Sequence, residues 1–140
     1  MIEKTLVLVK PDGVNRRLVG EVIRRIENKG LKPVCLRMMH LNEKTAEAHY
    51  SVHKGKDFYD RLIKFITASP IVAMVIEGEN AIELCRKLAG ATSFHDALPG
   101  TIRGDYACTT AENVVHTSDS LESAEREISI FFRPEQILKY

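Results

Sequence analysis

Several side chains in this sequence are of the types that bind phosphate groups. Arginine can bind a phosphate through two parallel hydrogen bonds, lysine adds a compact positive charge, and threonine donates a hydroxyl hydrogen bond. The candidates follow an apolar run, lie near the end of an expected helix, or fall in a long aperiodic segment: Lys10, Arg86, Thr92 and Arg103. Two glycines near Arg103, Gly100 and Gly104, could let backbone N–H groups approach a ligand closely. The set predicts a polyphosphate site.

His116 is the candidate nucleophile for such a site. It follows the short apolar pair Val114-Val115, which is a brief strand candidate. A histidine in an ordinary environment is largely neutral at pH 7, so one ring nitrogen keeps a lone pair. Taken alone, a histidine also fits a structural role, and arginines are surface charges by default.

Other kinds of site are disfavoured by the motifs. The sequence has no Gly-x-x-x-x-Gly-Lys-Ser/Thr and no Gly-x-Gly-x-x-Gly, so a nucleotide would not be cradled by a glycine-rich loop. His49 and His53 have the spacing of a zinc protease, but Tyr50 replaces the glutamate base. Ser118, His116 and Asp119 are too close in sequence to converge as a triad. The histidines outside position 116 have no partner pattern and are expected to be structural: His40, His49, His53 and His95.

Composition restricts the class of protein. The chain has 140 residues, is 44% hydrophobic and 28% charged, and carries a net charge of +1. These values suit a single globular domain over residues 1–140 and give no general field for nucleic acid or membrane. The three cysteines form no Cys-x-x-Cys pair, so reduced thiols in a cytoplasmic protein are expected. The apolar run at residues 6–9 is too short for a membrane span or a signal peptide.

Periodicity indicates four strands with intervening helices. Strands are expected at residues 6–9, 34–39, 71–76 and 114–115, with the third covered on both faces. Helical stripes cover residues 18–29, 42–50, 58–66, 81–88 and 121–130. Asn42 and an Asp119-x-x-Glu122 capping box are expected to begin two of them, and Gly30 and Gly90 to end two others. Residues 91–110 have no period and are expected to form a loop. The order favours an α+β fold: a ferredoxin-like βαββαβ sandwich with a four-stranded antiparallel sheet and an extra helical pair after the second strand.

Four blocks of sequence carry a family resemblance. They are residues 5–14 (TLVLVKPDGV), 72–78 (VAMVIEG), 99–106 (PGTIRGDY) and 113–128 (NVVHTSDSLESAEREI). With these blocks in this order, the chain resembles nucleoside diphosphate kinases over essentially its full length. The resemblance implies a ping-pong reaction in which a nucleoside triphosphate, mainly ATP, phosphorylates His116 and a nucleoside diphosphate then takes the phosphate, maintaining nucleoside triphosphate pools.

The resemblance also implies roles for individual residues. Phe58 matches the residue that stacks on the base, and six others match phosphate and sugar contacts: Lys10, Tyr50, Arg86, Thr92, Arg103 and Asn113. Ser118 and Glu127 match the groups that orient the histidine, and a carboxylate at Glu127 would fix the ring tautomer. The implied cofactor is Mg²⁺, carried mainly by the nucleotide phosphates rather than by protein ligands. The implied assembly is a homo-oligomer, either a tetramer or a hexamer.

Two departures from the family pattern affect these expectations. Thr117 stands where the family usually has glycine after the histidine, so a difference in the backbone is expected just after His116. Residues 93–98 also differ from the usual start of a loop that often makes subunit contacts.

Two rival functions remain to be weighed. An RNA-binding module on the same fold predicts sheet aromatics and a basic face, which 6% aromatics and near-neutral charge disfavour. A catalytically inactive regulatory homologue would be favoured by loss of the histidine or the cations, and both are present.

Overall fold

The computed structural model describes all 140 residues, Met1–Tyr140. Four strands form one antiparallel sheet in the order β2-β3-β1-β4. The strands are β1 (Ile2–Val9), β2 (Lys32–Met39), β3 (Ile71–Glu79) and β4 (Val115–Thr117). The helices are α1 (Pro11–Asn15), α2 (Val19–Asn28), α3 (Glu43–His49), α4 (Tyr59–Ile66), α5 (Ala81–Ala89), α6 (Ile102–Tyr106) and α7 (Leu121–Phe131). This is the expected ferredoxin-like sandwich, with α3 and α4 as the extra helical pair after β2.

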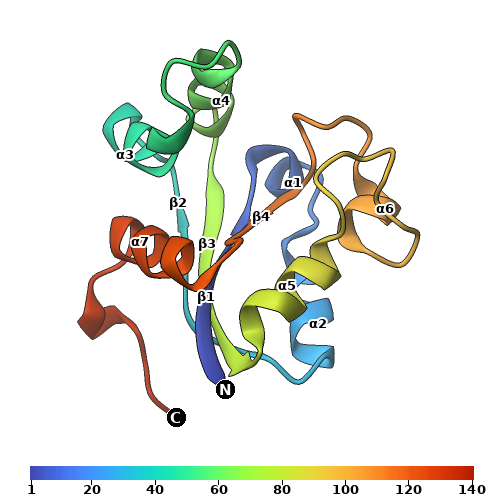
Figure 1. Cartoon of the computed structure of the whole chain (residues 1–140), viewed down its shortest axis with the longest axis vertical. Helices are drawn as coiled ribbons and strands as arrows, with labels where there is room; N and C mark the ends of the chain where they lie inside the picture. Colours follow the sequence, from blue (N-terminus) through green and yellow to red (C-terminus); the bar gives the residue numbers. More distant parts are fainter.

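Both faces of the sheet are covered, which explains the continuous apolar strands. Alternate residues of a strand point to opposite faces. Val7 and Val9 of β1 pack with α2 and α5, whereas Leu6 and Leu8 pack with α3, α4 and the end of α7. In Figure 1 the sheet is seen nearly edge-on, with α2 and α5 on one side and α7 on the other. β1 therefore lies between two apolar layers, with β4 beside it at the edge of the sheet.

Most of the expected boundaries are confirmed within a few residues. The Asn42 side chain accepts a hydrogen bond from the Thr45 N–H at 2.8 Å and begins α3. Gly30 follows the end of α2 with a φ of +87°, a left-handed conformation that glycine adopts without strain. β1 begins four residues earlier than its apolar run, because residues 2–5 pair with the end of β3 even though their side chains are partly polar.

Some expectations were wrong. Residues 11–15 form the short helix α1, which the periodicity did not predict, and α6 lies inside the segment expected to be a loop. The cap of α7 is Ser120, which accepts from the Ser123 N–H at 3.1 Å, and not Asp119. Thr101 caps α6 in the same manner, accepting from the Gly104 N–H at 2.9 Å. Helices as short as α1 and α6 have too few residues to show a hydrophobic period in the sequence.

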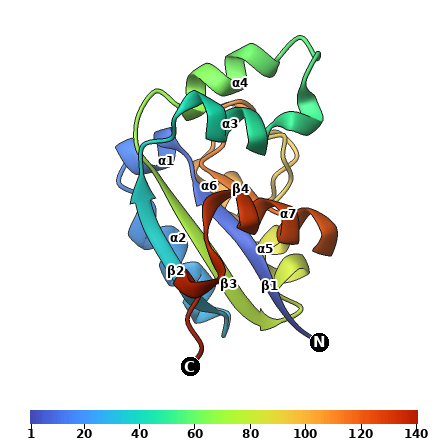
Figure 2. The ribbon, with the colours of Figure 1, turned by 90° about the vertical axis from the view of Figure 1, so that its left-hand side faces the viewer.

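The C-terminal segment returns to the sheet of its own chain. After α7 the chain makes a 3₁₀ turn at Pro134–Gln136 and runs beside β2, where the Leu138 N–H donates to the Val34 carbonyl at 2.9 Å. Figure 2, which views the sheet from the face covered by α3 and α7, shows this segment crossing toward β2. None of the helices is both long enough and apolar enough to span a membrane.

Candidate active site

One pocket of about 1300 Å³ collects the residues singled out from the sequence. Its lining includes the candidate nucleophile and all seven candidate nucleotide contacts: His116, Lys10, Tyr50, Phe58, Arg86, Thr92, Arg103 and Asn113. Ser118 and Glu127 do not line the pocket, but lie buried behind His116. The structure therefore brings together residues that are distant in sequence, from the junction of β1 and α1, from β4, α5 and α6, from the ends of the helical pair, and from the loops around residues 92 and 113.

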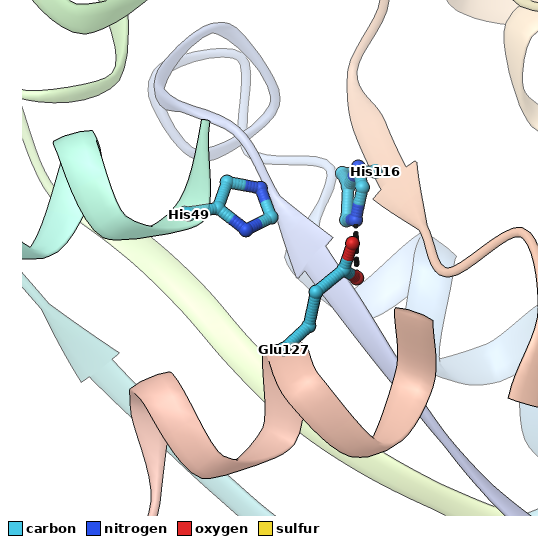
Figure 3. Close-up of side chains that lie close together, drawn as sticks. All are labelled: His49, His116 and Glu127. Atoms are coloured by element: carbon cyan, nitrogen blue, oxygen red, sulfur yellow. Dashed lines mark hydrogen bonds and ion pairs between the residues drawn. The ribbon is translucent and has the colours of Figure 1, made fainter. Parts of the chain in front are cut away.

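His116 is held from behind by a carboxylate. Its Nε2 lies 2.8 Å from Glu127 Oε1, and the same oxygen accepts a hydrogen bond from the Ser118 hydroxyl at 2.7 Å. An ionised carboxylate only accepts, so His116 Nε2 carries the ring proton and Nδ1 keeps its lone pair. In Figure 3 the second ring nitrogen points away from Glu127. The hydrogen bond expected between these two residues is confirmed.

The carboxylate is itself kept ionised by its partners. Burial opposes ionisation of Glu127, but hydrogen bonding and charge interaction with His116, together with the Ser118 hydrogen bond, outweigh burial and lower its pKa. Ser118 is fixed to the sheet, since its hydroxyl accepts from the Leu6 N–H at 3.3 Å and its own N–H donates to the Leu6 carbonyl at 3.2 Å. The orientation of His116 thus depends on β1 through Ser118 and on α7 through Glu127. Arg126 Nη2 lies 3.6 Å from the other carboxylate oxygen, Glu127 Oε2.

The strained backbone lies before His116, and not after it as expected. Val114 has a φ of +76°, and the Val115 N–H donates to the Asn113 carbonyl at 2.9 Å, which closes a γ-turn. Such a conformation at a β-branched residue costs on the order of 1–3 kcal/mol and persists only where neighbours impose it. Thr117 lies in β4, pairs with Val7 of β1 and has no positive φ. The position after His116 therefore accepts a β-branched residue.

Residues of β1 and α1 impose the Val114 turn. The Lys10 N–H donates to the Val114 carbonyl at 2.8 Å, and the Val114 N–H donates to Asp12 Oδ2 at 3.0 Å. Gly13 lets α1 approach, because a Cβ there would lie 3.0 Å from the Val114 carbonyl oxygen and 2.7 Å from Val9 Cγ1. Asp12 thus helps to place His116, a role that its position in sequence did not suggest.

Four cations of the pocket have no carboxylate within ion-pair distance: Lys10, Arg61, Arg86 and Arg103. Lys10 is 8% exposed, and its Nζ donates to Asn113 Oδ1 at 2.7 Å. Burial, with Arg103 nearby, lowers the pKa of Lys10 to about 8. Arg103 donates to the carbonyls of Gly90 and Val115, both at 2.8 Å, and burial followed by the charge of Arg86 lowers its pKa to about 10. Cations held close together in a partly dry pocket favour an anionic ligand.

Gly100 and Gly104 were expected to offer free N–H groups to a ligand, but both N–H groups are already hydrogen-bonded within the protein. The Gly100 N–H donates to Asp105 Oδ1 at 2.9 Å, and the Gly104 N–H is used by the cap of α6. Gly104 serves close packing instead, because a Cβ there would lie 1.9 Å from the Leu98 carbonyl oxygen. Asn113 ties this loop to the pocket floor, since its Nδ2 donates to the Thr92 carbonyl at 3.0 Å.

Aromatic side chains form the opposite end of the pocket. Phe58 is half-buried at the start of α4, with the His53 ring edge-on at 5.3 Å between centroids. Tyr50 is almost fully buried and packs at 4.6 Å from His49, and burial followed by the charge of Glu127 raises its pKa to about 12. Phe58 is thus free to stack on a planar ligand, whereas Tyr50 stays a neutral phenol.

His49 was expected to be a structural histidine, because no partner for it is evident in the sequence, but its ring lies against that of His116. The two rings meet edge-on with centroids 4.7 Å apart, and His49 is only 2% exposed. The contact arises where the end of α3 packs on α7, so no spacing in the sequence could have revealed it. Figure 3 shows His49, His116 and Glu127 converging from α3, β4 and α7.

Comparison with known proteins shows the family of the chain. The family model for nucleoside diphosphate kinase matches residues 3–137. A nucleoside diphosphate kinase of Pyrococcus furiosus is 54% identical over 99% of this chain and 88% of its own length. One of Methanocaldococcus jannaschii is 53% identical over 98% of both chains. The solved structure of a halophilic nucleoside diphosphate kinase from Halobacterium salinarum in complex with CDP has a TM-score of 0.97 at 45% identity, covering 100% of this chain and 93% of that one. The chain therefore belongs to the nucleoside diphosphate kinase family and is a phosphotransferase.

Proposed function

We propose that the chain moves the terminal phosphate of a nucleoside triphosphate, mainly ATP, to nucleoside diphosphates through a phosphohistidine on His116. The observation that carries the proposal is the hydrogen bond between His116 Nε2 and Glu127, which leaves the Nδ1 lone pair available in a pocket with four cations lacking carboxylate partners. Nδ1 attacks the terminal phosphorus, and the bond to the leaving diphosphate oxygen breaks. The phosphorylated ring then transfers the group to a second nucleotide in the same pocket.

The cations suit the charge that develops during transfer. A transferring phosphoryl group spreads negative charge over its oxygens, so positioning and cationic stabilisation supply most of the catalysis. Lys10 and Arg103 are buried and held by hydrogen bonds to Asn113 and to backbone carbonyls, so they need little rearrangement when a phosphate arrives. Arg86 is exposed, and its Nη1 donates to the Asp119 carbonyl at 3.2 Å. We assign these three residues and Thr92 to the phosphates.

Phe58 supports a broad choice of base. It and Leu62 give the far end of the pocket an apolar surface on which the face of any base can stack. Stacking without a set of edge hydrogen bonds discriminates poorly between bases, which suits an enzyme that balances several nucleoside triphosphate pools.

Mg²⁺ belongs to the substrate in this proposal. The pocket's buried polar side chains are Lys10, Arg103 and Asn113, and the Asn113 oxygen already accepts from Lys10. Two cations and an occupied amide do not form the oxygen ligand set that Mg²⁺ requires. The carboxylates that line the pocket do not form a metal-binding cluster: Glu3, Glu83, Asp96 and Asp119. The ion is therefore carried mainly by the nucleotide phosphates, where it neutralises part of their charge.

Assembly and location extend the same proposal. β2 is an edge strand that exposes Leu36 and Met38, at 52% and 60%, a surface suited to a second copy of the chain in a tetramer or hexamer. The three free cysteines suit a reducing cytoplasm. An RNA-binding sheet is disfavoured, because helices cover both sheet faces. Light scattering coupled to size-exclusion chromatography distinguishes the oligomers from a monomer.

The test is incubation with ATP labelled on its terminal phosphate. The wild-type chain and a His95→Ala control, which alters an exposed histidine outside the pocket, are expected to become labelled, whereas His116→Ala is not. The label is expected to be acid-labile and base-stable and to be discharged by any nucleoside diphosphate. A wild-type chain that stays unlabelled contradicts the proposal.

A further inference from the structure

His49 is a buried polar side chain whose polarity the phosphate chemistry does not use. Both of its ring nitrogens are buried and have no hydrogen-bond partner. Leaving a buried polar group unpaired costs on the order of 1–3 kcal/mol. The ring sits between His116 and Phe131, with centroid separations of 4.7 and 5.4 Å, where a phenylalanine would fit without that cost. An unpaired nitrogen beside two further ligand-type groups suggests a bound atom.

The side chains around His49 keep it neutral. Burial, followed by the charge of His116, lowers its pKa to about 3; Arg126 and Lys10 act in the same direction, and Glu127 opposes them. A neutral imidazole has a lone pair, which is the form that binds metals.

The ligand atoms of His49, His116 and Glu127 all lie within 4.8 Å of one another. Two imidazoles and one carboxylate form a donor set that suits Zn²⁺ and its transition-metal neighbours, with bonds of about 2.0–2.2 Å and a fourth position open to water. Tetrahedral bonds of that length place ligand atoms roughly 3.3–3.5 Å apart. His116 Nε2 and Glu127 Oε1, now 2.8 Å apart, need to separate only slightly while His49 moves inward.

We propose that His49, His116 and Glu127 form an inhibitory site for Zn²⁺ or a similar imidazole-binding divalent cation. The ion replaces the proton shared by His116 and Glu127 and bonds to His116 Nε2. It is distinct from the nucleotide's Mg²⁺, which prefers six oxygen ligands and does not compete for imidazole nitrogen.

Inhibition follows from proton balance on the ring. A neutral imidazole carries one proton, so a metal on His116 Nε2 leaves that proton on Nδ1. The proton passes from Nε2 to Nδ1 through solvent, and the charge of the chain excluding the ion is unchanged. This consequence rests on the proposed function, because it matters only if Nδ1 is the nucleophile. Metal binding itself does not depend on that function.

The binding test is equilibrium dialysis of Zn²⁺ against nucleotide-free protein. All variants carry Cys108→Ser, since an exposed thiol also binds zinc. We expect one tight site per chain in this background and in the His95→Phe control, which removes an exposed histidine. His49→Phe keeps a buried ring but removes one ligand, and we expect more than about tenfold weaker binding. Equal zinc binding by His49→Phe and the control, or no tight site in either, overturns the proposal.

A second measurement stands if His49→Phe fails to fold. In nitrogen NMR of the wild-type chain, zinc is expected to shift the ring nitrogens of His49 and His116 together. Shifts confined to other histidines contradict the site. Inhibition is tested by single-turnover phosphorylation with Mg·ATP. Phosphorylation is expected to be lost in zinc-loaded wild type and retained in His49→Phe at the same concentration of free zinc. An unchanged wild-type rate contradicts the inference that bound zinc leaves the ring proton on Nδ1. A chain that binds zinc but is never labelled by ATP, even without zinc, contradicts the proposed function and leaves the metal site intact.

Discussion

Replacing Glu127 with glutamine removes the charge that fixes the His116 tautomer while keeping the size of the side chain. In the wild type, Glu127 Oε1 accepts from His116 Nε2 at 2.8 Å and from the Ser118 hydroxyl at 2.7 Å. A glutamine can still accept from one of them, but its amide can also turn its N–H₂ toward His116 and favour the proton on Nδ1. The variant therefore weakens the preference for the reactive tautomer.

The size of the effect follows from the bond that is lost. A hydrogen bond to a charged group contributes about 1.5–3 kcal/mol, which corresponds to roughly a tenfold to 150-fold slower phosphorylation step. Glu127 is 5% exposed, so solvent screens this bond little. The matched control is Glu125→Gln, an exposed glutamate on the same helix.

The assay is single-turnover phosphorylation with labelled ATP in a rapid-quench instrument. Steady-state turnover alone does not suffice, because product release can mask a slower chemical step. Glu127→Gln is expected to slow the single-turnover rate, and Glu125→Gln is expected to match the wild type. An unchanged rate in Glu127→Gln would refute the role assigned to this carboxylate.

Three further perturbations test other parts of the structure. Lys10→Met is expected to abolish activity yet raise the free energy of unfolding at pH 7 by up to about 3 kcal/mol, since the burial that lowers the pKa of Lys10 to about 8 is a cost to the folded state. The folded pKa of Lys10 lies below its ordinary value of 10.5, so the cost in stability fades as pH rises from about 8 toward 10.5. The unfolding free energies of wild type and variant, measured by denaturation, should therefore converge over this range. A difference in unfolding free energy that stays constant with pH contradicts this explanation. Asp12→Ala leaves the buried Val114 N–H without its acceptor at 3.0 Å. This variant is expected to lower the free energy of unfolding by about 1–3 kcal/mol and to lower kcat more than it raises KM. Asp12→Asn keeps an acceptor and should retain most activity, so equal losses in both variants would contradict the hydrogen-bond role. Ile66→Ala removes a fully buried side chain at the end of α4 and is expected to lower the free energy of unfolding, measured in urea, by about 2–5 kcal/mol. The control is Leu36→Ala on the exposed edge strand, and a similar loss of stability in that variant would argue against this packing.

The sequence predicted the elements whose patterns are local and long. Residues 71–76 are apolar without interruption because both sheet faces are covered, and this strand was placed correctly. Its last residues, Glu77–Glu79, lack that pattern and are held in the strand by pairing with Ile2–Lys4. Such pairing depends on a partner far away in the chain, so periodicity does not report it.

The site was predicted unevenly for the same reason. Lys10, Arg103 and His116 lie in sequence blocks with a recognisable pattern, and the structure places all three at one pocket. His49 and Asp12 act through contacts with residues 67 and 102 positions away, respectively, and only the packing of α3 and α1 creates those contacts. The strain at Val114 was missed because valine gives no signal of a left-handed backbone; it is imposed by Lys10 and Asp12.

The most direct test of the account is the identity of the nitrogen that carries the phosphate. The Glu127 hydrogen bond to Nε2 leaves Nδ1 as the only ring nitrogen of His116 with a free lone pair. Phosphorus and nitrogen NMR of ring-labelled protein after reaction with ATP distinguishes the two isomers of phosphohistidine. We expect one phosphate per chain, bonded to Nδ1 of His116. Phosphate on Nε2, or on a different residue, would contradict it.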